Sequence, residues 1–349
     1  MARHLTEVFS QLGLAVEYDD SAPATGGECG NLICRLPGSG GPPMLLAAHL
    51  DTIGPTAGIE VVEEKGVFRA RGGGILGADD RAGVAIMVEV ARVLRESGGS
   101  PLELELLFPV SEEVGLRGSH FLTPGFVLAK YGFSLDLSGP IGSLVNRAPF
   151  GQKLEIAIRG KAAHAGLEPE AGINAIALAA AAISGIRQGR LDELSTANIG
   201  MINGGEATNI VPDLVHVSGE ARSLDEDRLE KHVESIREIF LRFVRKGGGD
   251  VEFESRRAYP GFFLGEDSLP VRVFRTAAAR CGLPFLLQTS CGASDANFLN
   301  GYGIETVNLS VGMTEPHTST EHIHRSDILA AARLVLELIL VAAERLPPE

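Results

Sequence analysis

The chain has 349 residues, with 31 Lys or Arg and 45 Asp or Glu, so its formal net charge is -14. An excess of negative charge repels phosphate backbones and anionic lipid, which argues against nucleic acid and membrane surfaces as partners. The content of 44% apolar and 22% charged residues is typical of a globular protein and excludes a disordered or fibrous chain. Because a single core stops growing near about 250–300 residues, we expect a large domain and a smaller one.

The cysteine content, the first residues and the apolar runs of the sequence predict where the protein is located. The four cysteines form no CxxC pair, which fits a reducing compartment better than a disulfide framework. The first residues contain no apolar segment with a cleavage signature. The longest apolar helical runs, at 175–183 and 334–343, are too short to span a bilayer. We therefore predict a cytoplasmic protein without a membrane segment.

The first 148 residues alternate between strand-like and helix-like segments. Short apolar runs bounded by Gly and Pro predict strands, and helical periodicity predicts a helix that ends before Gly98 and Gly99. The expected elements are strands at 32–36, 44–48, 103–110 and 133–137 and a helix at 82–95. This alternation is typical of an α/β layer with a largely parallel sheet.

The pattern changes after Pro149 to strand, helix, strand, strand, helix, strand, which is the ferredoxin-like order. The expected elements are strands at 153–159, 196–202, 214–221 and 250–255 and helices at 173–186 and 224–245. Beyond Gly261 the first pattern returns, with helices at 269–281 and 327–346 and a strand at 306–309. The sequence thus predicts a small domain inserted into a larger α/β domain.

Carboxylate and imidazole side chains follow several strands of the first pattern. Ligands of a doubly wound sheet bind beyond the carboxyl ends of its strands. The groups are His49 with Asp51, Asp79 with Asp80, Glu112 with Glu113, Asp136, and His317 followed by His322 and His324. Taken singly, each has an ordinary explanation as a solvated loop residue or, for Asp79, as a helix N-cap.

Taken together, these groups favour a metal centre. Oxygen and imidazole ligands without thiolate suit zinc or a related divalent ion at a catalytic site. There are enough of them for two ions that share one carboxylate, with one Glu left as a general base. Gly72, Gly74 and Gly77 also form a GxGxxG pattern, but Asp79 and Asp80 would repel a pyrophosphate at that helix start.

These motifs resemble one family, the dinuclear zinc exopeptidases related to peptidase T, carboxypeptidase G2 and aminoacylase, and above all its peptidase T-like tripeptidase branch. The segments that carry the resemblance are AAHLDT, ILGADDRAG, SEEVGL, DLSGPIGSLVNRAP, GKAAHAGLEPE, GGEATNIVPD, GEARSLDE, SDAN and HTSTEHI. The resemblance implies a zinc-dependent exopeptidase domain of residues 1–149 and 263–349, with a mixed, mostly parallel sheet. It also implies a ferredoxin-like α+β lid and dimerisation domain at 150–262.

The resemblance further implies two Zn²⁺ in each subunit, with Co²⁺ or Mn²⁺ as possible replacements. The implied ligands are His49, Asp79 and Asp136 for one ion and Asp79, Glu113 and His317 for the other. Asp51 would orient His49. Glu112 would be the general base that takes a proton from water and passes it to the leaving amine.

Substrate contacts and a homodimer through the lid are also implied. His164 would reach the active site of the partner subunit and stabilise the oxyanion, Asn209 would bind substrate, and Arg222 would clamp its carboxylate. Asp295 and Asn297 would line the pocket. The ordinary alternatives are a loop histidine for His164 and a surface salt bridge for Arg222. The Ala-rich helix at 173–186 is expected either to self-associate or to pack on its own sheet.

The activity implied is that of an aminopeptidase that cleaves small peptides, most simply tripeptides. An N-acyl amino acid deacylase, a dipeptidase or a carboxypeptidase on the same scaffold, and a metal-binding module without hydrolysis, are the alternatives. The sequence departs from the family pattern at Arg81, which replaces Lys, and at Cys291 and Ala293, which replace glycines of a loop near the substrate. The chain is also expected to begin within the first helix of the family.

Overall fold

The computed structural model describes residues 1–54, 56 and 58–345. The chain forms two compact units, one of Met1–Ala148 together with the chain from Phe262 onward, and one of Pro149–Gly261. Residues 55, 57 and 346–349, which belong to the predicted larger domain and include the last position of its final predicted helix, lie outside the described residues. The predicted fold class, an α/β domain that carries an inserted antiparallel domain, is confirmed.

The first unit is built on a mixed sheet of nine strands among the described residues. In spatial order they are β1 (Val16–Tyr18), β2 (Leu32–Leu36), β6 (Leu104–Phe108), β3 (Met44–Ala47), β7 (Tyr131–Leu137), β16 (Glu305–Ser310), β8 (Ser143–Ala148) and β14 (Phe262–Phe263), with β15 (Leu286–Thr289) also paired to β8. The four central strands β6, β3, β7 and β16 run parallel to one another. Their carboxyl ends therefore meet at one edge of the sheet.

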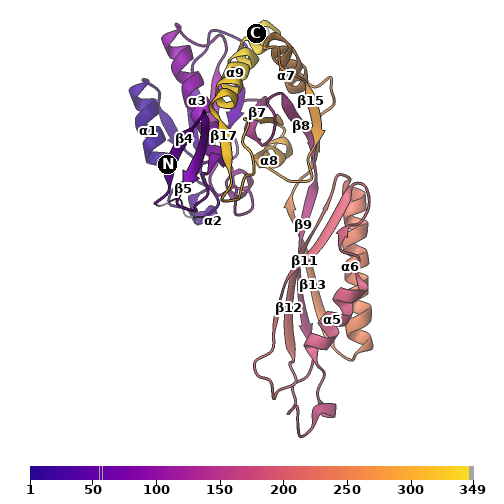
Figure 1. Cartoon of the computed structure of the whole chain (residues 1–349). Coiled ribbons are helices and arrows are strands. Elements are labelled where there is room, and N and C mark those ends of the chain that lie inside the picture. Colours follow the sequence, from indigo (N-terminus) through magenta and orange to yellow (C-terminus); the bar gives the residue numbers. More distant parts are fainter. Residues whose placement is uncertain (55, 57, 346–349) are drawn as a thin grey trace. The chain divides into compact units, whose positions relative to one another are not determined.

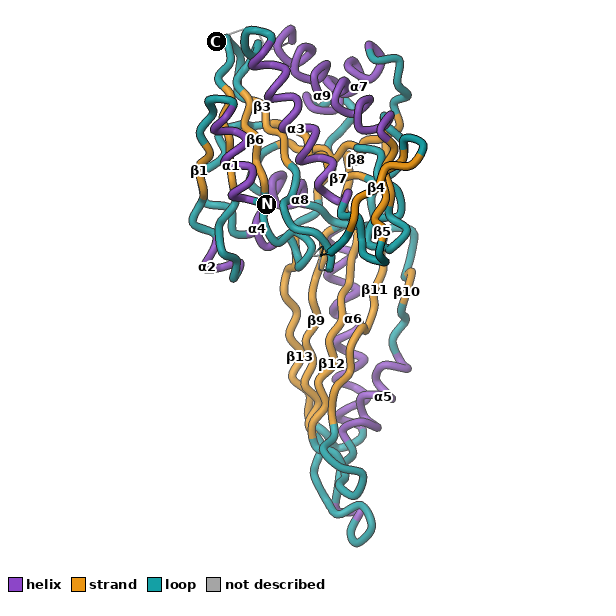
Figure 2. Tube along the Cα trace, turned by 60° about the vertical axis from the view of Figure 1, so that its left-hand side comes forward, coloured by secondary structure: helices purple, strands orange, loops and turns teal. Residues whose placement is uncertain are grey.

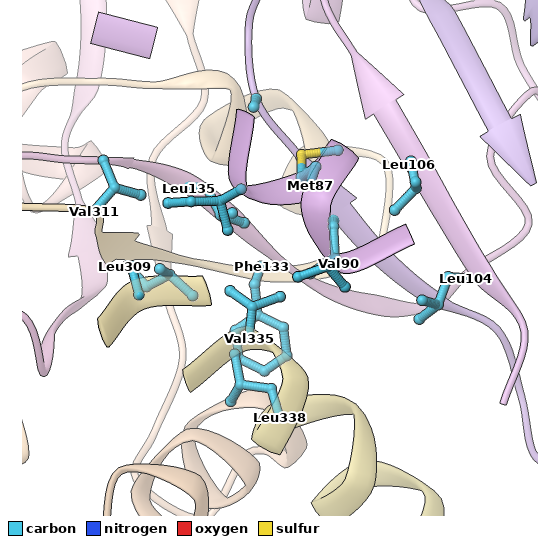
Figure 3. Close-up of a cluster of buried hydrophobic side chains, with 14 of the residues drawn as sticks. Met87, Val90, Leu104, Leu106, Phe133, Leu135, Leu309, Val311, Val335 and Leu338 are labelled. Atoms are coloured by element: carbon cyan, nitrogen blue, oxygen red, sulfur yellow. The ribbon is translucent and has the colours of Figure 1, made fainter. Parts of the chain in front are cut away.

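Both faces of this sheet are covered, which explains why successive residues of its central strands are buried rather than alternately buried and exposed. Met44 and Leu46 of β3 face one core cluster, whereas Leu45 and Ala47 face another. Figure 3 shows part of the first cluster, where Phe133 of β7 lies among side chains of neighbouring strands and helices. Full burial of one such side chain stabilises the fold by roughly 1.5–3 kcal/mol.

Helices supply the covering layers (Figure 1). The larger cluster includes buried residues of α1 (Ala2–Gln11), α3 (Ala78–Glu96), α7 (Leu269–Arg280) and α9 (Arg325–Arg345). The opposite cluster contains Leu299 of α8 (Asp295–Gly301). The short helices are α2 (Ala22–Thr25) and α4 (Arg117–His120).

A small antiparallel sheet of β4 (Glu60–Glu64), β5 (Val67–Arg71) and β17 (His322–His324) completes the first unit. Strand β4 was not predicted from the sequence, because its residues EVVEE are mostly exposed and lack the alternation of a half-buried strand. Strand β17 pairs with β5 from more than 250 positions away in the sequence, which no local pattern indicates.

The inserted unit has the predicted ferredoxin-like topology. Its elements are β9 (Phe150–Arg159), a 3-10 turn (Pro169–Ala171), α5 (Ala175–Gly185), β10 (Gly189–Arg190), β11 (Ser195–Gly204), β12 (Leu214–Ser223), α6 (Glu226–Lys246) and β13 (Asp250–Tyr259). The sheet order is β10-β11-β12-β9-β13, and all pairs are antiparallel. Figure 2 shows the four long strands side by side, with α5 and α6 against them.

The two helices of this unit pack on its own sheet. The Asp225 carboxylate caps α6 by accepting a hydrogen bond from the Arg228 amide at 2.9 Å, and the apolar stripe of α6 faces the strands. Ala175, Ala179 and Ala182 of α5 are fully buried in the same core. That part of the Ala-rich face is therefore used for packing within the unit, as the alternative interpretation stated. No helix among the described residues is both long and apolar enough to cross a lipid bilayer.

Candidate metal centre

The predicted ligands of the first unit gather where the four parallel strands end. His49 and Asp51 follow β3, Glu112 and Glu113 follow β6, Asp136 lies near the end of β7, and His317 lies in the loop after β16. Because these strands are neighbours in the order β6-β3-β7-β16, their ends place the side chains side by side. Asp79 joins them from the start of α3.

Asp51 contacts the His49 ring and also holds the loop after β6 in place. The Nδ1 atom of His49 lies 3.0 Å from the main-chain carbonyl oxygen of Asp51 and 3.7 Å from its carboxylate. The ring is therefore oriented mainly by the carbonyl, which directs Nε2 toward the other ligands. The Asp51 carboxylate accepts hydrogen bonds from the amides of Glu112 and Glu113, at 3.0 and 3.1 Å.

Asp79 and Asp80 stand in non-helical backbone at the start of α3 and are joined by a cis peptide bond. The helix comes so close to β7 that a Cβ at Gly83 would lie 2.6 Å from the Leu135 carbonyl oxygen and 2.4 Å from an Asp80 carboxylate oxygen. Only glycine permits this approach, which explains the Gly of the ADDRAG segment.

Asp79 is shared between the two histidines. Its Oδ1 lies 3.0 Å from Nε2 of His49, and its Oδ2 lies 3.0 Å from Nε2 of His317. On the first side Nε2 of His49 is also 3.6 Å from Asp136 Oδ1. On the second side Nε2 of His317 is 3.1 Å from Glu113 Oε2. The geometry thus divides the side chains into two groups that meet at one carboxylate.

The charges of this centre are poorly balanced by protein groups alone. Burial, with the charges of Asp79 and Asp295, raises the pKa of Asp136 to about 7 despite the opposing effect of His49. Burial, followed by the charges of Asp136 and Asp295, raises the pKa of Glu112 well above its usual value. Burial alone would lower the pKa of His49, yet its carboxylate partners raise it well above the ordinary value.

The centre fits divalent cations. Its donors are carboxylate oxygens and imidazole nitrogens, and Oε1 of Glu113 is buried without a hydrogen-bond partner among the described residues. Ligand atoms about 2.0–2.2 Å from a tetrahedral Zn²⁺ lie roughly 3.3–3.6 Å apart, close to the separations found here. Two sets whose ligand atoms lie within 4.8 Å of one another combine His49 with Asp79 and Glu113, or with Asp80 and Asp136.

Asp80 is better described as a support than as a ligand. Its Oδ2 accepts a hydrogen bond from the His49 amide at 3.2 Å, and its Oδ1 accepts one from the Gly83 amide at 3.1 Å. Both Asp80 oxygens accept hydrogen bonds from the backbone, whereas the two Asp79 oxygens face His49 and His317. Asp79 is therefore the better candidate ligand. This supporting role was not predicted for Asp80, because no pattern in the sequence indicates these two hydrogen bonds.

Glu321 is a second residue whose contact with the centre was not predicted from the sequence. It is only 2% exposed, and its carboxylate accepts hydrogen bonds from the amides of Gly77 and Asp79. Burial raises the pKa of Glu321. The sequence showed it only as part of HTSTEHI, with no sign of partners more than 240 positions away.

Two predicted pocket residues lie at the start of α8. Asp295 is 2% exposed, its Oδ1 has no hydrogen-bond partner among the described residues, and burial raises its pKa to about 6. Asn297 is fully buried, and its side chain forms a reciprocal capping box with Ser294. The cap accounts for Asn297 without a substrate.

The remaining predicted contacts lie in the inserted unit. His164 is exposed, and its Nδ1 accepts hydrogen bonds from the amides of Gly166 and Leu167 at 3.2 and 3.1 Å. The neutral ring therefore carries its proton on Nε2. The Ala165 amide donates to the carbonyl oxygen of Asn209 at 2.9 Å, so these two loops are paired.

Arg222 takes part in the ion pair that was its alternative interpretation. Its Nη2 lies 3.0 Å from the Glu220 carboxylate, and its guanidinium stands 6.0 Å from the centre of the Tyr259 ring. Tyr259 is buried, which raises the pKa of its hydroxyl to about 12.

The first unit gathers carboxylates and histidines at its strand ends, and the α+β unit is inserted into it. This combination is typical of the class of metal-dependent hydrolases. Two family models match the chain: one described as a peptidase dimerisation domain, over residues 152–247, and one described as peptidase family M28, over residues 31–158.

Relatives that match nearly the whole chain identify the family within this class of hydrolases. The uncharacterized protein YqjE of Bacillus subtilis is 42% identical, covering 97% of this chain and 92% of that one. The aminopeptidase PepT structure of Bacillus cereus is 41% identical, with a TM-score of 0.89, and a tripeptidase structure of Staphylococcus aureus is 35% identical, with a TM-score of 0.92. Each structural match covers 98% of this chain and 92% of the other. The chain belongs to the M20 family of metallopeptidases, in its peptidase T-like branch.

Proposed function

We propose that this chain is a di-metal aminopeptidase that acts on short peptides, most simply tripeptides. The observation that carries the proposal is the division of the two Asp79 oxygens between His49 and His317. A carboxylate that faces two ligand groups is suited to bridge two cations held about 3.5–4 Å apart. The names of the Bacillus cereus and Staphylococcus aureus relatives support an aminopeptidase and a tripeptide substrate.

Zn²⁺ is the first choice for both positions, with Co²⁺ or Mn²⁺ as replacements. His49, Asp79 and Asp136 would hold one ion, and Asp79, Glu113 and His317 the other. When bound, such cations polarise the scissile carbonyl group and ease the deprotonation of water.

Glu112 is the proposed general base. Its amide is fixed by Asp51, and burial raises its pKa well above that of a surface glutamate, which makes it a stronger base. A base of this kind accepts a proton from the attacking water and delivers it to the amine that leaves.

The inserted unit is proposed to complete the site in a homodimer, which the match to a dimerisation domain supports. Its His164 has an exposed ring with the proton on Nε2, the form needed to donate to an oxyanion. Arg222 and Asn209 are the proposed contacts for the peptide carboxylate and main chain. They lie, like His164, within the matched range of 152–247.

The test is a substrate comparison with protein freed of metal by chelation and then reloaded. We expect two Zn²⁺ per chain, release of the first residue from tripeptides, and little cleavage of the same peptides with an acetylated N-terminus. Faster cleavage of N-acyl amino acids would indicate a deacylase. Release of the last residue would indicate a carboxypeptidase, which the 26% identity to carboxypeptidase G2 from Pseudomonas makes the main alternative. Metal binding without turnover would indicate a binding module.

A further inference from the structure

The loop that carries His317 is closed on itself. Thr314 and His322 exchange backbone hydrogen bonds at 2.9 and 3.1 Å, which joins the two ends of the loop. Inside it, the Thr318 hydroxyl donates to the Glu315 carbonyl at 2.8 Å, and the Glu321 amide donates to the Thr318 carbonyl at 3.2 Å. His317 has a left-handed backbone, with φ of 64°. Its ring position therefore depends on where this whole loop is held.

Glu321, near the end of that loop, reaches across to the start of α3. Its Oε2 accepts a hydrogen bond from the Gly77 amide at 2.6 Å, and its Oε1 accepts one from the Asp79 amide at 3.0 Å. Gly77 is the N-cap of α3 and has no side chain with which to satisfy the free amides of the first turn. A carboxylate from another part of the chain takes that place.

We propose that Glu321 is a positioning residue that holds the bridging carboxylate of Asp79 and the loop of His317 in one fixed arrangement, and so sets the metal affinity of the centre. This inference rests on the proposed metal centre. Glu321 acts on one ligand through the Asp79 amide and on another through its own loop. Loss of Glu321 therefore frees Asp79 and the loop of His317 to move. The separation of 3.0 Å between the His317 ring and Asp79 would then no longer be fixed.

A carboxylate is needed here because two backbone amides must be accepted at once. A glutamine offers one oxygen, and its amide nitrogen would face a backbone N–H donor with another donor. Metal–ligand bonds tolerate shifts of only about 0.2 Å, so a displaced peptide unit is felt at the ion. Loss of a partner that orients a ligand typically weakens metal affinity about 10–100-fold.

The chain offers a matched control in Glu105 of β6. This carboxylate is fully buried, and its Oε2 accepts hydrogen bonds from the amides of Leu128 and Ala129, each at 2.8 Å. Glu105→Gln likewise removes the charge of a buried carboxylate bonded to two backbone amides, although here both amides donate to Oε2 and Oε1 accepts from Arg35 Nε at 3.0 Å. The change touches no proposed ligand. It separates loss of stability from loss of metal positioning.

The experiment compares native protein, Glu321→Gln, Glu321→Asp and Glu105→Gln. Each is freed of metal and titrated with Zn²⁺ against a coloured competing chelator, and thermal unfolding of the metal-free forms is recorded. We expect Glu321→Gln to raise the Zn²⁺ dissociation constant about 10–100-fold and Glu105→Gln to leave it unchanged. Saturating Zn²⁺ should restore most of the kcat of Glu321→Gln on a tripeptide.

Two results would overturn the proposal: native-like Zn²⁺ affinity in Glu321→Gln, or an equal loss of affinity in Glu105→Gln. If Glu321→Gln does not fold, Glu321→Asp decides, because its shorter side chain keeps the charge but cannot reach both amides and should still weaken binding. Failure of the proposed function is seen separately in the native titration, where absence of Zn²⁺ binding would remove the metal centre itself.

Discussion

The metal centre and the predicted contacts of the inserted unit differ in what holds them. In the first unit His49 is 2% exposed, and its ring and amide have fixed partners at Asp51, Asp79 and Asp80. In the inserted unit His164 and Asn209 are exposed. Residues of the first kind are placed by the fold, whereas the roles predicted for His164 and Asn209 depend on a substrate or a partner subunit.

This difference separates two kinds of effect. Changes of the proposed ligands should alter metal content together with activity, because the ligands are held by one another. Changes in the inserted unit should alter kinetics alone. The predictions below test that separation, beginning with the largest expected effect.

Replacement of Asp79 by Ala should abolish both metal binding and hydrolysis, since the two groups of ligands meet at this carboxylate. Metal analysis is expected to find less than one ion per chain. The control is Glu89→Ala, an exposed acid of the same helix whose carboxylate pairs with Arg92, which should leave both properties intact. Retention of one tightly bound ion with partial activity would show that Asp79 does not bridge.

Glu112→Gln should lower kcat by about 10²–10⁴-fold while two ions per chain remain bound. The matched change at the adjacent residue, Glu113→Gln, removes a ligand and should reduce metal content as well. Substantial activity in Glu112→Gln would assign the base to another group, and metal loss in that variant would make Glu112 a ligand.

The gathering of the side chains of the centre could be predicted because strand ends are visible in the sequence, whereas their assignment as ligands came from the family resemblance and stays a prediction. Short apolar runs, bounded by turns, predicted strands that correspond to β3, β6, β7 and β16. The polar residues at the carboxyl ends of these runs were the candidates. The supports were not visible. Asp80 and Glu321 act through backbone amides, which leave no periodic pattern, and the Glu321 partners are 244 and 242 positions away.

Residue Asn297 of α8 presents the reverse case. Asn297 was predicted to contact substrate, yet it is fully buried in a reciprocal cap with Ser294. A serine three positions before a side chain able to reach back is a capping signal, so this role could have been weighed from sequence. In the inserted unit the topology was predictable from the order of elements, whereas the substrate roles of Asn209 and Arg222 stay predictions.

His164→Ala should reduce kcat by about 10²–10³-fold, the usual cost of an oxyanion donor, without changing metal content or thermal unfolding. Mixed dimers sharpen the test. A subunit with His164→Ala paired with one carrying Glu112→Gln regains activity only if His164 serves the partner's site, because one site then contains both intact residues. Mixed dimers without activity, formed from inactive homodimers, would place His164 in its own subunit's site.

The smallest effect concerns the pH dependence of stability without metal. The pKa of Asp136 is raised from 3.8 to about 7, and that of Glu112 is also raised, so the folded protein binds protons that the unfolded chain releases. The stabilisation from Asp136 is complete below about pH 4 and is lost as pH rises through about 7, and that from Glu112 is lost as pH rises through its own raised pKa. The raised pKa of His49 acts in the same direction, since its contribution is complete below pH 6.5 and is lost above it.

We therefore expect the unfolding midpoint of chelated protein to fall from pH 5 to pH 8. Asp51 and Asp79, whose pKa values are lowered, do not oppose this change, because they stay ionised in both states within that range. Differential scanning fluorimetry provides the measurement, and added Zn²⁺ should reverse the fall. Asp136→Asn should flatten the curve of the chelated protein. An unchanged slope in that variant would show that Asp136 does not carry the effect, which would then belong to other groups or to the overall charge of -14.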